Sequence, residues 1–277
     1  MEPIYIIEAG YGALCGKWGG WIVASRFSEV STRVLLASPR GSHVEPFLRA
    51  ELNGFSLQVA ETPDAIRRAI SEGPRPDLSV IDLTWDDYRD GFDFDGLDAL
   101  RMLQNRDHGA RVVFAARGHA GERDHVDEAA AKPHVAGFYL KEYGFSLLAR
   151  AIVGAAAGER LDGPDFPWCG NPRGVTPIYK YFDNGSEGRT AAQMAGAIAS
   201  GRVMDTETLT TVTGIPKGTA SRPQDYLGPL ITERGEYPEQ MRVKQGVVYR
   251  WCGEHSRYIL SWCRRNGLAR LAVRVTA

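Results

Sequence analysis

Long hydrophobic runs and clusters of cysteine are both absent from this 277-residue sequence. No apolar stretch approaches the roughly 20 residues of a transmembrane helix, and the first three residues lack the basic region of a signal peptide. We therefore expect a cytoplasmic protein with no membrane partner. The four cysteines, Cys15, Cys169, Cys252 and Cys263, lack the spacing of a paired metal site or of a disulfide framework. Reduced thiols and no bound metal are the default expectation.

The short motifs of common enzyme centres are also missing. The sequence has no nucleophile elbow, no zinc-protease helix and no complete phosphate loop, and its six histidines are scattered. Residues 4–20 approximate the dinucleotide fingerprint, but the third glycine falls one place late and Gly16-Lys17 is followed by Trp18. The favoured alternative is a hairpin of residues 4–9 and 21–24. We expect no enzymatic activity, no catalytic residue and no cofactor.

Charge is distributed unevenly, although the whole chain has a net charge of only −1. Residues 1–170 contain 18 Lys and Arg against 25 Asp and Glu, a net of −7, and residues 171–277 contain 15 against 9, a net of +6. An acidic module joined to a basic one is the pattern of a control domain followed by a nucleic-acid-binding domain. A charge of +6 is modest for that role.

Alternating strand and helix signals fill residues 31–158. The run from Leu78 to Leu83 is apolar except for Ser79 and Asp82, as expected of a central strand covered by helices on both faces. Asp82 would then lie at the carboxyl edge of the sheet, where open α/β sheets place their sites. The other strands are predicted at residues 33–37, 55–60, 111–115 and 137–141. Helices are predicted at residues 44–52, 64–72, 96–103, 122–131 and 145–158, the second capped by Thr62-Pro63.

This alternation, with Asp82 on the third strand and Lys141 ending the fifth, resembles the receiver domain of bacterial response regulators. The resemblance implies a flavodoxin-like parallel sheet with Asp82 as phosphoacceptor. The family's acidic pair after the first strand is replaced by Ser38 and Pro39, and its Thr or Ser after the fourth strand by Ala115-Ala116. Without the acidic pair Mg²⁺ loses most of its charged ligands, so phosphorylation should be badly impaired.

The vestigial pocket therefore consists of Asp82, Lys141, Ser38, Pro39 and Ala115, and we favour a remaining ion pair between Asp82 and Lys141. A pocket lined by Ser38, Arg40, Arg117 and Lys141 could take a small anionic ligand or be filled by the long loop 84–95. The carboxylates of this loop could also rebuild a cation site, although a solvated acidic loop is favoured; they are Asp86, Asp87, Asp90, Asp93 and Asp95.

Residues 159–180 contain four prolines and no periodicity, which is typical of a domain boundary. The predicted organisation is an N-terminal extension at 1–30 packing on the receiver as a hairpin, a receiver-like domain at 31–158, a linker at 159–180 and a helix-turn-helix domain at 181–277.

The C-terminal part is predicted to be mainly helical. A helix is expected at residues 189–200, and a second at 206–213 with Asp205 as its cap. Residues 214–222 then resemble the turn and recognition helix of NarL/LuxR-type regulators and of winged helices. The NarL/LuxR first-helix signature is absent, and Pro223 either shortens the recognition helix or restarts it with Ser221 as cap.

Two further features follow the expected recognition helix. Residues 230–234 and 243–251 could pair as a β-hairpin wing. A final helix at 255–266 is expected to have Tyr258, Ile259 and Trp262 on its apolar side and Arg257, Arg264 and Arg265 outside. Cys252, His255 and Cys263 could contact zinc, but packed thiols are favoured because one ligand is missing.

These patterns predict a transcription regulator with a degenerate receiver domain, acting on double-stranded DNA as a homodimer formed by the helices at 122–131 and 145–158. The predicted DNA-binding residues are Lys217, Thr219, Ser221, Arg222, Gln224, Arg242, Lys244 and Arg250. The alternative is an adaptor whose receiver-like domain binds a protein or a small anionic ligand and which does not read DNA.

Overall fold

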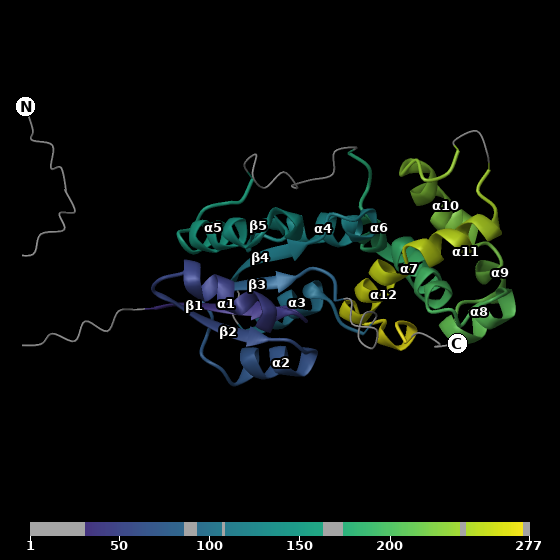
Figure 1. Cartoon of the computed structure of the whole chain (residues 1–277). Coiled ribbons are helices and arrows are strands. Elements are labelled where there is room, and N and C mark those ends of the chain that lie inside the picture. The colour runs from purple at the N-terminus through teal and green to yellow at the C-terminus, as the bar shows by residue number, and fades with distance from the viewer. Residues whose placement is uncertain (1–30, 86–92, 107–108, 163–173, 239–241, 274–277) are drawn as a thin grey trace, which may run out of the picture. The chain divides into compact units, whose positions relative to one another are not determined.

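The computed structural model describes residues 31–85, 93–106, 109–162, 174–238 and 242–273 (Figure 1). Contacts between residues divide the chain into Met1–Val30 and Ser31–Ala277. The predicted hairpin and the glycine-rich stretch fall in the first unit and so lie outside the described residues. Below, residues 31–162 are the sheet domain and residues 174–273 are the helical domain.

The sheet domain is built on five parallel strands in the order β2-β1-β3-β4-β5. The strands are β1 Thr32–Ala37, β2 Phe55–Ala60, β3 Leu78–Asp82, β4 Arg111–Ala116 and β5 Val135–Leu140. This order is that of flavodoxin-like sheets, so the predicted fold class is confirmed. Ala37 pairs with Ile81 and Asp82 pairs with Ala115. The carboxyl ends of β1, β3 and β4 are therefore level, which brings Ser38, Asp82 and Ala115 to one edge.

Helices cover both faces of the sheet. One face is covered by α1 Gly41–Glu51 and α5 Phe145–Ala156, whose buried residues include Leu48 and Ile152. The other face is covered by α2 Pro63–Ser71, α3 Gly96–Arg106 and α4 Arg123–Ala130. Every residue of β3 and β5 is buried, which explains why these strands show no alternation of polar and apolar residues.

Local signals set two helix starts. The Thr62 side chain accepts a hydrogen bond from the Ala65 N–H at 3.1 Å, and Pro63 occupies the first turn of α2, as predicted. Gly96 begins α3 directly against the end of β3. A Cβ at this position would lie 2.5 Å from the carbonyl oxygen of Asp82, so only glycine lets α3 approach the strand so closely.

The helical domain packs around α7 Gly185–Ala199, which contacts most of the other helices. The others are α6 Ile178–Phe182, α8 Thr206–Thr213, α9 Lys217–Ala220, α10 Pro223–Glu233, α11 Gln245–Glu254 and α12 Ser256–Arg265. Asp205 caps α8 in a capping box with Thr208, as the sequence predicts for the cap. No helix among the described residues is long and apolar enough to span a membrane.

The predicted wing is wrong. Residues 230–234 form the end of α10 and the start of the turn after it, and residues 245–251 belong to α11. The apolar residues of this segment have helical spacing, since Leu227, Leu230 and Ile231 are buried together. Apolar side chains spaced three and four residues apart lie on one face of a helix, which can pack on a core. In a strand the same spacing would place apolar side chains on both faces.

Pro223 divides the predicted recognition helix. The helix α9 ends at Ala220 after four residues, and α10 starts at Pro223 with Arg222, rather than Ser221, at the cap position. The Ser221 hydroxyl instead donates to the carbonyl oxygen of Gly218 at 3.1 Å. Proline cannot donate a backbone hydrogen bond but is well suited to a first helical turn, so the chain stops one helix and begins another.

Candidate functional site

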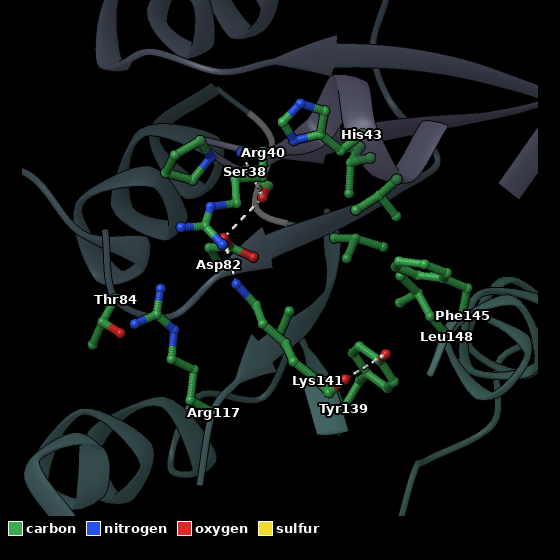
Figure 2. Close-up of a pocket in the computed structure, with 15 residues that line it drawn as sticks. Ser38, Arg40, His43, Asp82, Thr84, Arg117, Tyr139, Lys141, Phe145 and Leu148 are labelled. Atoms are coloured by element: carbon green, nitrogen blue, oxygen red, sulfur yellow. Dashed lines mark hydrogen bonds and ion pairs between the residues drawn. The ribbon is translucent and has the colours of Figure 1, made fainter. Parts of the chain in front are cut away.

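Asp82 lies at the end of β3 and is held by two side chains that directly follow β1 and β5 (Figure 2). The Lys141 ammonium donates to Asp82 Oδ2 at 2.6 Å, and the Ser38 hydroxyl donates to the same oxygen at 2.8 Å. Burial raises the pKa of the Asp82 carboxyl, and the contacts with Lys141 and Ser38 offset only part of this effect. The ion pair expected from the sequence is thus present, in a largely water-excluded position.

The groups that would hold a divalent cation beside Asp82 are not assembled in the described part of the chain. Pro39 and Ala115 line the same edge and offer no carboxylate. Among the described residues there is no group of three or more His, Cys, Asp or Glu side chains that could hold a metal ion. Asp93 is exposed, and Asp95 is buried against other partners. Asp86, Asp87 and Asp90 lie outside the described residues.

A cavity of about 710 Å³ lies beside Asp82 at this carboxyl edge (Figure 2). This volume is within the range of small-molecule sites, roughly 300–1,000 Å³. The structure brings together the four residues predicted to line such a pocket, and it adds Tyr139, whose pKa is raised to about 12 by burial and by Asp82. The lining residues with polar or charged side chains are Ser38, Arg40, His43, Asp82, Thr84, Arg117, Tyr139 and Lys141.

Glu122 is a residue of the site that sequence reasoning missed. Its carboxylate accepts a hydrogen bond from the Thr84 hydroxyl at 2.6 Å and from the backbone N–H groups of Arg117 and Gly118 at 2.8 and 3.0 Å. Thr84 and Arg117 both line the cavity, so Glu122 fixes two of its loops. The only sequence signal was a carboxylate at the start of a predicted helix.

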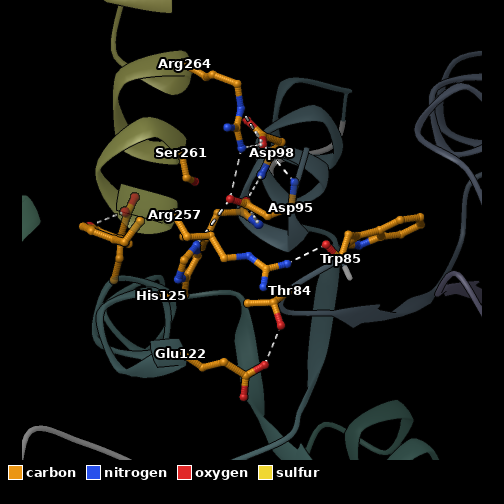
Figure 3. A network of polar contacts seen from close by, with 12 residues as sticks. Thr84, Trp85, Asp95, Asp98, Glu122, His125, Arg257, Ser261 and Arg264 are labelled. Atoms are coloured by element: carbon orange, nitrogen blue, oxygen red, sulfur yellow. Dashed lines mark hydrogen bonds and ion pairs between the residues drawn. The ribbon is translucent and has the colours of Figure 1, made fainter. Parts of the chain in front are cut away.

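The helical domain docks on the sheet domain through charged side chains of α12 (Figure 3). Arg264 donates to Asp98 at 2.7 Å and to Asp95 at 3.2 Å, and Arg257 donates to the carbonyl oxygen of Trp85 at 2.5 Å. The buried His125 lies 3.4 Å from Asp95. Burial works to raise the pKa of Asp95, but His125 and Arg264 together hold it below its usual range. Asp95 therefore serves the domain contact and faces α12.

A second group of contacts connects α12 with α4. Arg265 forms two hydrogen bonds with the Glu128 carboxylate, at 2.5 and 2.9 Å, and the Tyr258 hydroxyl donates to the same carboxylate at 2.7 Å. All three side chains are buried. Burial works to raise the pKa of Glu128, but Arg265 and Tyr258 hold it below its usual value.

A third group links α4 to the ends of α10 and α11. Asp124 accepts from Arg234 at 2.8 Å and lies 2.7 Å from His255 Nδ1, while His255 Nε2 lies 3.2 Å from Glu236. Burial works to lower the pKa of His255, but Asp124 and Glu236 stabilise its charged form and raise that pKa to about 9. Trp251 also donates to Glu236.

These contacts correct two expectations. Arg264 and Arg265 were expected on the outer, solvent-facing side of the last helix, but they face acidic residues of the sheet domain. Residues 122–131 were expected to form a dimer surface, but α4 is covered by helices of its own chain, and Asp124 and Glu128 are buried. The acidic and basic parts of the chain are complementary to each other, so part of the positive charge is used within the molecule.

The predicted DNA-binding residues lie on different parts of the helical domain. Thr219 and Gln224 are half-buried, and the Gln224 Oε1 atom has no hydrogen-bond partner within the described part of the chain. The Arg222 guanidinium donates to the Gly218 carbonyl oxygen and forms an ion pair with Asp225. The exposed members of the set are Lys217, Ser221, Arg222, Arg242, Lys244 and Arg250.

The residues considered for zinc do not form a site. Cys252 and Cys263 are buried free thiols, and burial raises the pKa of both. His255 is engaged by two carboxylates from other elements. The preference for packed thiols agrees with this arrangement.

No protein-family model matches the chain, and no curated protein matches it in sequence. Similar solved structures include the RcsB response regulator of Salmonella typhimurium, in a study of conformational dynamism for DNA interaction, at 10% identity and a TM-score of 0.42. RcsB of Salmonella enterica serovar Typhimurium bound to promoter rprA with the phosphomimetic BeF₃⁻ is 10% identical, with a TM-score of 0.44. Each alignment covers 80% of this chain and 98% of the other. Fold does not imply function, so the function proposed below is argued from this chain's own residues.

Proposed function

We propose that this protein is a cytoplasmic, DNA-binding transcription regulator whose receiver-like domain works without phosphorylation of Asp82. Regulation without phosphorylation is supported by the contacts of Asp82, whose carboxylate already accepts hydrogen bonds from Lys141 and Ser38. Phosphoryl transfer to a carboxylate requires a divalent cation to neutralise the charge of the donor. Ser38 and Pro39 offer no charged ligand for such a cation.

The turn between α8 and α9 supports DNA binding. Gly214 has a φ of 76°, a left-handed conformation that glycine adopts without strain, and it lets the chain leave α8 and enter α9 in a tight turn. Lys217, Ser221 and Arg222 follow this turn and are exposed while the helical domain is docked on the sheet domain. A basic, polar segment after a helix and turn is the arrangement with which helix-turn-helix proteins approach the major groove.

The test is a gel shift with DNA from upstream of the protein's own gene, measured at several salt concentrations. If Arg222 pairs with a guanine, Arg222→Ala should weaken binding to the specific site by about 1–3 kcal/mol and leave random DNA unaffected. Lys244→Ala should weaken binding to all DNA similarly and lower the salt slope by about one. Wild-type protein without preference for its own promoter fragment at physiological salt would contradict the proposal.

Two observations favour a second candidate function. Pro223 limits α9 to four residues, which is short for an element that reads base edges, and the sheet domain has a cavity lined by cationic side chains. An adaptor that binds a protein or a small anion and does not read DNA would fit both features. In that case neither Arg222→Ala nor Lys244→Ala changes any DNA affinity.

The proposal includes a homodimer, since helix-turn-helix proteins commonly bind two half-sites. Because α4 is covered, we assign the dimer contact to the surface formed by α1 and α5. On this surface Phe47 and Phe145 stack with ring centroids 4.7 Å apart, and Val153 is exposed. Light scattering at micromolar concentration should give the mass of a dimer, and Val153→Asp should reduce it to that of a monomer. A wild-type monomer would remove the dimer from the proposal.

A further inference from the structure

The cavity beside Asp82 combines a polar end with an apolar one. Figure 2 shows Ser38, Asp82 and Lys141 together on one side of the space, with Phe145 and Leu148 on the opposite side. The cavity lies at the carboxyl ends of β1 and β3, where the strand order reverses, and open α/β sheets bind ligands at this switch point. Its position and its volume of about 710 Å³ therefore suit a bound small molecule.

Asp82 presents one carboxylate oxygen that is not engaged. Its Oδ2 atom accepts hydrogen bonds from both Ser38 and Lys141, at 2.8 and 2.6 Å. Its Oδ1 atom receives no donor from the described part of the chain. Asp82 is buried and lines the cavity, and leaving a buried acceptor without a donor is unfavourable. This end of the cavity therefore favours a ligand that carries an N–H or O–H group.

Lys141 places a donor beside this acceptor. Its ammonium has three N–H groups, of which one is directed to Asp82. A donor and an acceptor side by side match the amide group, which carries an N–H next to a carbonyl oxygen. A charged ligand fits this pair less well. An anion would face the Asp82 carboxylate at Oδ1, and a cation would face the Lys141 ammonium, which lies 2.6 Å from the same carboxylate.

The apolar end is formed by side chains of both strands and helices. Leu36 and Val80 come from the sheet, Val44 comes from α1, and Leu148 and Phe145 come from α5. Phe145 keeps 39% of its surface exposed, although it lines the cavity. Covering this surface with an apolar ring is favourable, because apolar area is then removed from water.

We propose that the cavity binds a small neutral amide that carries an aromatic ring. The amide N–H donates to Asp82 Oδ1, the carbonyl oxygen accepts from the Lys141 ammonium, and the ring packs on Phe145 and Leu148. The polar pair fixes the orientation of the ligand, and the apolar end supplies the contact area. The site lies wholly in the sheet domain, so the inference stands whether or not the helical domain binds DNA.

The experiment is isothermal titration calorimetry of the full chain, without DNA, against three probes that share a phenyl ring and a carbonyl oxygen. Benzamide has the N–H donor, acetophenone has a methyl group in its place, and sodium benzoate has a charged oxygen there. We expect benzamide to bind one site per chain with a Kd about tenfold or more below that of either other probe, since a hydrogen bond to a charged group contributes about one power of ten or more.

Asp82→Asn should remove this preference for the amide. Ser38 and Lys141 still require an acceptor, so the asparagine oxygen takes the place of Oδ2 and its NH₂ group takes that of Oδ1. An NH₂ group donates and cannot accept from the ligand N–H. The Kd for benzamide should therefore rise by about tenfold or more, while the Kd for acetophenone does not rise.

A substitution at the apolar end should affect the two neutral probes alike. Phe145→Ala should raise the Kd for benzamide and for acetophenone by the same factor, because both carry the ring. The matched control is Tyr143→Ala, which removes a similarly exposed aromatic side chain that does not line the cavity and should leave both affinities unchanged. Circular dichroism of each variant checks that the fold is retained. If Asp82→Asn does not fold, the wild-type comparison of benzamide with acetophenone decides alone.

Four results would overturn the inference. The first is wild-type affinity for acetophenone equal to that for benzamide, which would mean that Oδ1 takes no part in binding. The second is tighter binding of benzoate than of benzamide, which would make the ligand an anion. The third is a folded Asp82→Asn variant that keeps the preference for benzamide. The fourth is no binding of benzamide to wild-type protein up to the limit of its solubility.

Discussion

Removal of the Glu128 carboxylate should be the most damaging single change at the contact between the domains. Glu128→Ala leaves the guanidinium of Arg265 buried without a carboxylate and leaves the Tyr258 hydroxyl without its acceptor. The side chain of Arg265 is only 8% exposed, so little of it is in contact with water once its partner is lost. Breaking a buried ion pair by removing one member costs about 3–5 kcal/mol. This is a large part of the 5–15 kcal/mol by which domains are typically stable.

Urea unfolding, followed by circular dichroism, measures the change. The matched control is Lys132→Ala, because Lys132 approaches the same carboxylate at 3.7 Å but its side chain is 37% exposed. An exposed pair contributes about 1 kcal/mol or less, so the two variants should differ by roughly 2 kcal/mol or more. Replacing both partners, as Glu128→Leu with Arg265→Met, should recover most of the lost stability, because no charge is then left buried.

The reasoning is refuted if Glu128→Ala costs no more than Lys132→Ala. That outcome would mean that Arg265 finds water or another acceptor when its partner is removed, and that the domain contact is not held by this pair. If Glu128→Ala is destabilising but the double variant is worse, the pair is net favourable and the apolar replacement packs poorly.

Three further predictions concern pH, packing and phosphorylation. His255 has a pKa of about 9 in the folded protein against 6.5 ordinarily, so its charged form adds about 3 kcal/mol to the free energy of unfolding. This stabilisation is complete below pH 6.5 and is lost as the pH rises through 9. His255→Gln should therefore make the free energy of unfolding, measured in urea, depend less on pH over this range. Gly188→Ala should cost about 1–3 kcal/mol in urea unfolding, because its Cβ would lie 2.2 Å from a backbone carbonyl oxygen. Acetyl phosphate should leave Asp82 unmodified by mass spectrometry; Mg²⁺-dependent labelling that disappears in Asp82→Asn would contradict this.

The sheet domain could be predicted almost element by element because its signals are local. The apolar run ending at Asp82 is long enough for one buried strand, and Thr62-Pro63 marks the start of a helix by its own side chains. The ion pair of Asp82 with Lys141 was expected from the resemblance to receiver domains, and it fits a parallel sheet, whose strands bring their carboxyl ends to one edge. The cavity itself could not be measured from sequence, because its volume depends on how α1 and α5 pack.

The helical domain was predicted less well because two signals conflicted. Residues 243–251 contain β-branched and aromatic residues, which favour a strand, but Val248, Trp251 and Cys252 have the spacing of a buried helix face. Burial on a core outweighs the weak intrinsic preference of a residue for strand or helix. The spacing was therefore the more informative signal, and the same holds for Leu227, Leu230 and Ile231.

The docking contacts had no local signal, because the partners are more than 100 residues apart in the chain. Arg264 on the last helix and Asp98 on α3 look like ordinary surface charges when each helix is considered alone. The uneven charge of the two parts of the chain was the one indication, and it was interpreted as a signal for nucleic acid. Opposite net charges within one chain also favour contact between its own domains, so this asymmetry does not by itself identify an external partner.

The cavity and the docking contact share a short segment of chain after β3. Thr84 lines the cavity and donates to Glu122, while the carbonyl oxygen of the next residue, Trp85, accepts from Arg257 of α12. Glu122 in turn binds the backbone of Arg117, whose side chain lines the same cavity. A ligand that binds the docked arrangement more tightly than the undocked one must stabilise docking by the same free energy, because linkage is reciprocal. This segment is therefore where occupancy of the cavity and the position of the helical domain are physically connected.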